Sequence, residues 1–288
     1  MDFFYCGVCQ GHFVKEKAEV QYPEEYFQEK YPQSFIARMA GPLLNLFINF
    51  RVRRIKRLLR NIKNPKILDY GCGSGKLIQA LLKSEIETVG FEPSAGAVTL
   101  AKKQNLLVYR EVKLVPGGYD LIMFWHSLEH TDNPLEVVRN IKQYLAPNGK
   151  LLIAVPNAAS WEARLFKENW FHYFFPWHQI QFTPAAIRTM LDKSDLMAAK
   201  FYFFNIEYNV PGLVQSFLNL FLPENLLYSV VSHRRVSMSN MSKGKAVLLV
   251  AFILLLVALP MLPILGLFFA LELILRKTGV MIIIAEKS

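Results

Sequence analysis

Three glycines at alternate positions constrain the fold of this chain more than any other feature. They are Gly71, Gly73 and Gly75, and they stand between an apolar run that ends in Asp69 and a segment of helical period that begins at Leu77. Glycine tolerates a positive φ angle and lets a ligand approach the main chain closely. A strand, a tight loop and a helix N-terminus in this order predict a nucleotide-type binding site.

The spacing of these glycines argues against a dinucleotide. A dinucleotide-binding fingerprint needs its third glycine at the sixth position, where this chain has Lys76. The bulk of a lysine there would obstruct the close packing of helix on strand. A second apolar run ends in Glu92, about 20 residues after the first glycine, where a carboxylate can accept hydrogen bonds from two ribose hydroxyls.

At these residues the chain resembles the class I S-adenosylmethionine-dependent methyltransferases, in which an acid precedes Gly-x-Gly-x-Gly and the second strand ends in an acid. The resemblance covers roughly residues 60–205 and extends through Leu128-Glu129-His130 to Pro156-Asn157. It is similar in these motifs to the branch that includes ubiquinone-pathway O-methyltransferases. The resemblance implies S-adenosylmethionine as the cofactor, with binding residues Asp69, Gly71, Cys72, Gly73, Gly75, Glu92 and Glu111.

Short apolar runs alternate with helical segments through the middle of the chain, which is typical of parallel strands buried on both faces. We expect an α/β fold, Rossmann-like and doubly wound, with a mostly parallel seven-stranded sheet and ligands at the carboxyl ends of the strands. The expected strands are 67–69, 88–91, 106–109, 121–124, 150–155, 200–204 and 279–285.

Four parts of the chain follow from this pattern. The expected boundaries are 1–62 for an N-terminal segment with a basic amphipathic helix, 63–210 for the cofactor-binding methyltransferase domain, 211–278 for interfacial helices and a membrane hairpin, and 279–288 for the last strand of the catalytic sheet.

Candidate catalytic residues follow the fourth expected strand. If the methyl acceptor is a hydroxyl, the enzyme must supply a base, and histidine titrates near neutral pH. His126, Glu129 and His130 stand at this position, and His178 follows a run of aromatic residues. We expect His130 to face the substrate. The alternatives are that one histidine of the group is only a hydrogen-bonding residue of the core or a loop, and that Glu129 caps a neighbouring loop. The resemblance would also allow Glu129 and His130 to hold a divalent ion, but two ligands are too few, and no metal is predicted.

Two further segments leave alternatives open. Cys6 and Cys9 have the spacing of half a zinc ribbon, but with His12 they offer at most three of the four ligands that structural zinc needs, and a plain turn is favoured. Residues 161–182, which are rich in aromatic side chains, interrupt the alternation of strands and helices. We expect them to form a lid and acceptor pocket, with a packed hydrophobic flap as the alternative.

Charge and hydropathy indicate a membrane partner. The chain has a net charge of +10 and is 52% hydrophobic. A cluster of basic residues suits either nucleic acid or an anionic membrane surface, but on a helix it is more often a solvated face, and only the apolar C-terminal segment favours the membrane. The motif that base-modifying relatives carry after the fourth strand is absent, so nucleic acid is not expected as a partner. The basic residues are Arg51, Arg53, Arg54, Lys56, Arg57, Arg60 and Lys63.

Residues 246–275 carry a single charge, that of Glu272, and Pro260 and Pro263 divide them into two arms. Each arm is too short to cross a hydrocarbon core of roughly 30 Å. Basic residues flank both ends, which places both on the cytoplasmic side. We therefore expect a re-entrant helical hairpin that turns between Pro260 and Pro263 and lies before the last strand. The alternative is one transmembrane helix with a disordered tail.

These observations together predict a membrane-associated methyltransferase with its catalytic domain on the cytoplasmic side. The expected reaction is O-methylation of a lipid-linked or amphipathic acceptor, such as a quinone precursor or a membrane-bound glycan intermediate, and membrane lipid is the second expected partner. A soluble small-molecule methyltransferase and a catalytically silent membrane scaffold are the alternatives. The intact glycine loop with Glu92 argues against the scaffold, which has no need of either.

Overall fold

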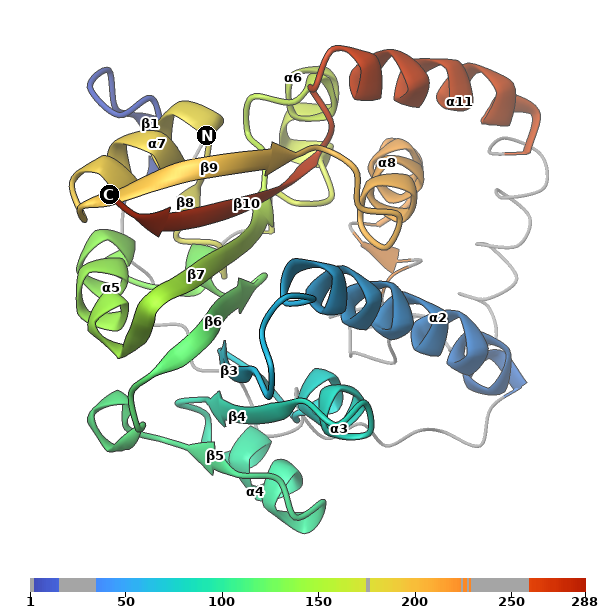
Figure 1. Cartoon of the computed structure of the whole chain (residues 1–288). Coiled ribbons are helices and arrows are strands. Elements are labelled where there is room, and N and C mark those ends of the chain that lie inside the picture. Colours follow the sequence, from blue (N-terminus) through green and yellow to red (C-terminus); the bar gives the residue numbers. More distant parts are fainter. Residues whose placement is uncertain (1–2, 16–34, 175–176, 224, 227, 229–258) are drawn as a thin grey trace.

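The computed structural model of the chain describes residues 3–15, 35–174, 177–223, 225–226, 228 and 259–288. Its centre is a seven-stranded sheet with helices on both faces (Figure 1). In spatial order the strands are β5 (Val108–Tyr109), β4 (Glu87–Phe91), β3 (Lys66–Tyr70), β6 (Tyr119–Trp125), β7 (Leu145–Pro156), β10 (Val280–Lys287) and β9 (Leu196–Tyr202).

The pairing of these strands confirms the predicted Rossmann-like, mostly parallel sheet. Strands β3 to β7 pair in parallel, and β10 runs antiparallel to both β7 and β9. Ile282 of β10 lies opposite Tyr202 of β9, so the last strand returns beside the strand that precedes it in the predicted order. The carboxyl ends of β3, β4, β5, β6 and β7 therefore lie at one edge.

Alternate residues of β6 explain why its sequence is continuously apolar. Leu121 and Met123 pack in a cluster with α2 (Phe35–Leu58) and α3 (Lys76–Leu82), whereas Ile122 and Phe124 pack with α5 (Pro134–Ile141) and α7 (Pro184–Asp192). All four side chains are fully buried. Side chains alternate between the two faces of a strand, and both faces here are covered by helices.

Several helices of the catalytic half begin directly after a residue whose side chain caps the helix N-terminus. Asn133 accepts a hydrogen bond from the backbone N–H of Glu136 at the start of α5, and Thr183 accepts one from Ala186 at the start of α7. A proline follows each cap, where its missing N–H costs nothing. The helix α4 (Ala95–Lys103) begins after Ser94 in a similar way and covers the β4–β5 end of the sheet.

A small second sheet lies at the N-terminus. Strand β1 (Phe3–Tyr5) pairs with β2 (His12–Val14), which pairs in turn with β8 (Ile180–Gln181) of the aromatic segment. Cys6 and Cys9 lie in the turn between β1 and β2, where the Cys6 N–H donates to the Gly11 carbonyl. Through the pairing of β2 with β8, the N-terminal strands are hydrogen-bonded to the segment that contains His178.

The C-terminal hydrophobic segment differs in part from the prediction. Within the described residues, helix α11 (Leu259–Ile274) is continuous through Pro260 and Pro263, so the expected turn between these prolines is wrong. Pro263 lies inside the helix, where a proline removes one backbone hydrogen bond but does not end the helix here. The first arm of the expected hairpin, residues 246–258, lies outside the described residues. Among the helices that the structure describes, none combines the length and the apolar character needed to cross a membrane.

Helix α11 packs against α6 (Trp161–Phe166) and α8 (Asn209–Leu218). The fully buried side chains of Glu162 and Glu272 lie at the contact between α6 and α11. A Glu272 carboxylate oxygen accepts a hydrogen bond from the backbone N–H of Glu162 at 2.9 Å. Burial first, and then the charge of Glu272, raises the pKa of Glu162 well above its usual range, and burial raises the pKa of Glu272 to about 7. The pair is therefore protonated in the folded chain under conditions where free glutamates are ionised.

This carboxyl pair predicts that the fold loses stability as the pH rises. Between the ordinary glutamate pKa of 4.5 and about 7, the folded chain keeps protons that the unfolded chain releases. Glu272→Gln should therefore flatten the fall in melting temperature between about pH 5 and about pH 8, as measured by circular dichroism. Glu168→Gln, which changes an exposed glutamate nearby, should keep the wild-type slope. A wild-type slope in Glu272→Gln as well would contradict the raised pKa of Glu272.

Candidate active site

The glycine loop between β3 and α3 has the geometry that its sequence predicts. Gly71, Gly73 and Gly75 have φ angles of 80°, 55° and 82°. A Cβ atom at Gly71 would lie 2.4 Å from the Cβ of Ser127, whereas a Cβ at Gly73 would meet open space. Positive φ thus requires glycine throughout, and the main chain at Gly73 is open to a ligand.

Glu92 lies directly after β4 and joins this loop. One of its carboxylate oxygens accepts the N–H of Gly73 and the other accepts the N–H of Ser94, both at 2.9 Å. The side chain is buried, which raises its pKa, while the two backbone hydrogen bonds oppose that change. A carboxylate has about four acceptor positions, so both oxygens keep capacity for ribose hydroxyls. The residues present therefore fit S-adenosylmethionine.

Asp69 and Cys72 complete the inner side of the loop. Asp69 is buried, and burial raises its pKa to about 7, against the lowering effect of Arg51. Burial also raises the pKa of the Cys72 thiol, and a Cβ at Gly90 would lie 2.5 Å from its sulfur. The thiol therefore packs against β4 in its neutral form.

Glu111 follows β5 at the same edge of the sheet but stands apart from the loop. Its exposed side chain forms an ion pair with Lys113 at 2.8 Å. Within the described residues, no hydrogen bond joins it to the glycine loop. The structure thus brings six of the seven predicted cofactor residues together and leaves Glu111 at their margin.

The four predicted catalytic residues lie in one cluster, in which His126, Glu129 and His130 follow β6 and His178 stands just before β8. The Nδ1 atom of His126 lies 3.1 Å from a Glu129 oxygen. The ligating atoms of Glu129, His130 and His178 all lie within 4.8 Å of one another. Ser127 links residues 126–130 to the start of the glycine loop, because its hydroxyl donates a hydrogen bond to the Tyr70 carbonyl at 2.6 Å.

Backbone carbonyls determine which nitrogen of two histidines carries the proton. The Nδ1 of His130 lies 2.9 Å from the Trp177 carbonyl, and the Nδ1 of His178 lies 2.9 Å from the His172 carbonyl. A carbonyl can only accept, so each Nδ1 is protonated and, in the neutral ring, each Nε2 carries the lone pair. Lone-pair nitrogens suit either proton transfer or metal binding.

Burial sets the charge state of the cluster. It lowers the pKa of His126 to about 3 and that of His178 well below its usual range, so both rings are neutral at physiological pH. It raises the pKa of Glu129 to about 7, against the lowering effect of His130. A carboxyl group that titrates near neutral pH beside a histidine is typical of a site for proton transfer.

The same three groups could hold a divalent ion. His178 supplies the third ligand that the sequence did not reveal, because it arrives from a segment 48 residues beyond His130. Two imidazoles and a carboxylate suit a transition metal better than calcium or magnesium.

Sequence reasoning missed Arg51 and Tyr208. The Tyr208 ring lies 3.9 Å from the His126 ring, and Arg51 donates to the Tyr208 hydroxyl at 3.0 Å and to Glu207. His126 itself has a φ angle of 53°, which is rare for a residue other than glycine and marks a strained position. The apolar period of α2 contained a signal for Arg51: it lies three residues after Ile48 and four before Ile55, on the buried face.

The fold, the glycine loop and the acid that follows β4 are together those of a class I methyltransferase that uses S-adenosylmethionine. A family model described as a methyltransferase domain matches residues 45–198, and the chain belongs to this family.

Known proteins agree with this class. The ubiquinone biosynthesis O-methyltransferase of Histophilus somni is 25% identical over 122 residues, which are 37% of this chain and 51% of the relative. The chain spans about half the length of the curated relatives it matches.

Two solved structures share the fold. A SAM-dependent methyltransferase from Archaeoglobus fulgidus is 18% identical, with a TM-score of 0.50, over 83% of this chain and 94% of the other. A putative sarcosine dimethylglycine methyltransferase from Galdieria sulphuraria is 13% identical, with a TM-score of 0.52, over 93% of this chain and 92% of the other.

Proposed function

We propose that this methyltransferase O-methylates a lipid-linked or amphipathic small molecule. The observation that carries the proposal is the attachment of the His126–His130 segment to the cofactor loop through Ser127. In this proposal the His126–His130 segment holds a group able to accept a proton beside the methyl group of the bound cofactor. S-adenosylmethionine supplies a methyl group that is already activated, so the protein has to position the acceptor hydroxyl and remove its proton.

Within this proposal His130 accepts the proton at Nε2. Its partly exposed ring stands beside the fully buried Glu129, whose charge stabilises an imidazolium. The Trp177 carbonyl keeps Nδ1 protonated and so leaves Nε2 as the basic atom. His126 and His178 then support the arrangement as neutral hydrogen-bonding groups.

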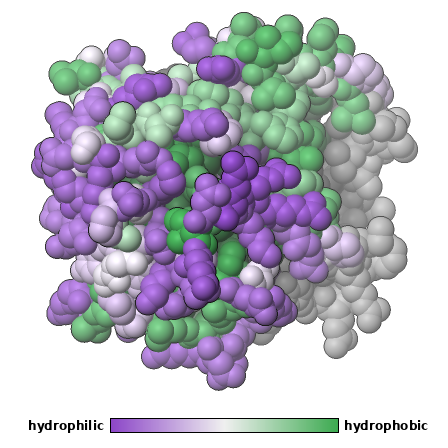
Figure 2. Space-filling view, in the orientation of Figure 1, coloured by the Kyte–Doolittle hydropathy of each residue, from purple (hydrophilic) through white to green (hydrophobic). Residues whose placement is uncertain are grey.

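Exposed apolar side chains support a lipid-like acceptor and contact with a membrane. Figure 2 shows hydrophobic side chains gathered along α11, where Ile264, Leu267 and Ile274 are more than half exposed. A surface of this kind marks a site of interaction with lipid or protein. In this proposal residues 63–210 and 279–288 form the catalytic unit on the cytoplasmic side, and residues 211–278 face the membrane with 1–62 alongside.

The acceptor class can be tested with labelled S-adenosylmethionine. We expect the protein to transfer label to a molecule in the lipid extract of its host's membranes, which mass spectrometry would detect. We also expect the protein to sediment with membranes and to resist digestion by protease added to intact cells. Label found only in the water-soluble extract would favour the soluble small-molecule alternative. No transfer to any extract would favour the silent scaffold.

A further inference from the structure

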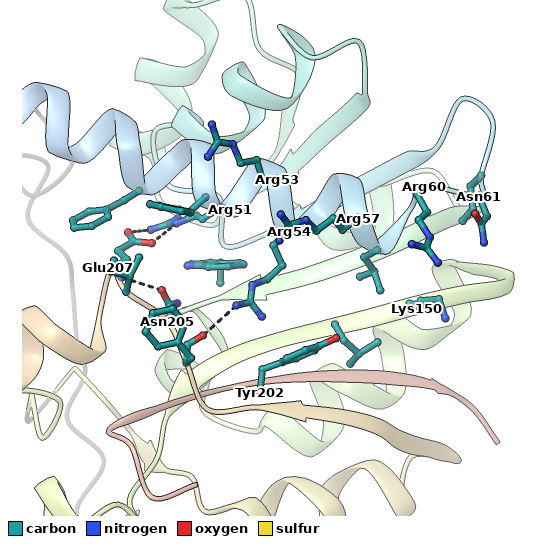
Figure 3. A pocket seen from close by; sticks show the side chains of 18 residues that line it. Arg51, Arg53, Arg54, Arg57, Arg60, Asn61, Lys150, Tyr202, Asn205 and Glu207 are labelled. Atoms are coloured by element: carbon teal, nitrogen blue, oxygen red, sulfur yellow. Dashed lines mark hydrogen bonds and ion pairs between the residues drawn. The ribbon is translucent and has the colours of Figure 1, made fainter. Parts of the chain in front are cut away.

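A hollow of about 700 Å³ lies between α2 and the strands β9 and β10, on the face of the sheet that α2 covers only in part (Figure 3). Arg54 and Arg57 of α2, Arg60 in the turn after it, Lys150 of β7 and Tyr202 of β9 line it. In Figure 3, Arg54 and Arg60 point into the hollow, whereas Arg53 points away. The glycine loop and the histidine cluster are not part of its lining.

The charge of this hollow is strongly one-sided. Six cationic residues and one acid line it. The acid, Glu207, is already bound to Arg51, and Lys150 pairs with Glu286. Among the residues that the structure describes, Arg54, Arg57 and Arg60 form no salt bridge.

Arg54 is already held in position for a ligand. Its guanidinium lies 5.0 Å from the centre of the Tyr202 ring and donates to the Phe204 carbonyl at 3.1 Å. Burial, partly offset by Tyr202, and the neighbouring charge of Arg57 lower the pKa of Arg54. A bound anion would relieve this repulsion between like charges.

A buried donor also lines the hollow. Trp125 is 8% exposed, and its indole N–H has no hydrogen-bond acceptor among the described residues. The remaining walls are apolar, and Figure 2 shows hydrophobic side chains inside a hydrophilic rim in this region. The apolar lining residues are Phe47, Phe50, Leu58, Ile62, Phe204, Ile206 and Ile284.

We propose that this hollow binds the phosphate or diphosphate of a long-chain alcohol. Guanidinium groups bind phosphate oxygens in a bidentate manner, which Arg57 and Arg60 are free to do, and the apolar walls would cover the chain. The combination of cationic rim and apolar interior distinguishes an amphipathic phosphate from a free one. The proposal does not depend on methyl transfer, because binding can be measured without cofactor or acceptor.

The proposal can be tested by calorimetric titration of farnesyl diphosphate into the full chain. The concentration of farnesyl diphosphate is kept below that at which it forms micelles. We expect Arg57→Gln/Arg60→Gln to weaken this binding more than tenfold, because two charge-assisted contacts are lost. Lys102→Gln/Lys103→Gln removes the same charge from exposed positions of α4 and should bind as the wild type does. Melting temperatures close to that of the wild type will show that both variants fold.

Two further probes separate the head group from the chain. Farnesol, which lacks the phosphates, and inorganic diphosphate, which lacks the chain, should each bind at least tenfold more weakly than farnesyl diphosphate. Inorganic diphosphate binding as tightly as farnesyl diphosphate would overturn the lipid assignment. Equal binding by Arg57→Gln/Arg60→Gln and the wild type, or an equal loss in Lys102→Gln/Lys103→Gln, would overturn the site itself.

Discussion

Replacing Glu92 with alanine should weaken S-adenosylmethionine binding by well over tenfold. The carboxylate is held by the N–H groups of Gly73 and Ser94, so its oxygens are fixed before the cofactor arrives. Each charge-assisted hydrogen bond to a ribose hydroxyl is worth roughly 1.5–3 kcal/mol, and two are lost together. Calorimetric titration of the cofactor into each protein measures the effect directly.

Two comparison variants sharpen this result. Glu87→Ala removes an exposed glutamate at the other end of β4, where it pairs with Lys66, and should leave cofactor affinity unchanged. Glu111→Ala tests the cofactor residue that the structure leaves at the margin, and its ion pair with Lys113 leads us to expect a smaller effect than that of Glu92→Ala. Unchanged affinity in Glu92→Ala would place the ribose elsewhere.

The sheet and the cofactor loop could be predicted because their causes are local. Parallel strands buried on both faces are continuously apolar, and a loop with positive φ at Gly71, Gly73 and Gly75 requires glycine at each position. The strand β9 begins earlier than expected, at Leu196 instead of residue 200, because its first residues pair with β10 despite their mixed character.

The course of residues 259–274 could not be predicted because proline has two local uses. It usually ends or kinks a helix, but it can also lie inside a helix that packs on its neighbours. Pro263 lies inside α11, which packs on α6 and α8. Sequence alone does not distinguish a turn between two helices from one helix that contains prolines.

The site shows the same division between local and long-range causes. The cluster after β6 could be predicted because polar residues that follow a parallel strand lie at the ligand edge. The contribution of Trp177, which determines the tautomer of His130, depends on a contact between residues 47 positions apart. The ring contact between Tyr208 and His126 joins residues that are still farther apart in the sequence.

Replacing His130 with alanine should lower the turnover number by about 10²–10⁴-fold, which is the usual contribution of a positioned base. Affinity for S-adenosylmethionine should stay nearly unchanged, because the Glu92 carboxylate is held in place by the N–H groups of Gly73 and Ser94. Steady-state kinetics and calorimetry on the same preparation separate the two quantities. His12→Ala, which changes a histidine of the N-terminal sheet, serves as the matched control and should keep wild-type turnover.

The pH profile and chelation then distinguish a base from a metal ligand. Glu129 titrates near neutral pH because it is buried, and it stabilises a positive charge on His130 only when ionised. Turnover of the wild type should therefore rise with pH through about 7, and Glu129→Gln should lose this rise. Activity that disappears with a chelator and returns with a divalent ion would instead identify Glu129, His130 and His178 as ligands of a metal. An equal loss of cofactor affinity in His130→Ala would show that this histidine is structural, because a base that faces the acceptor contributes to the chemical step and not to the affinity of the loop.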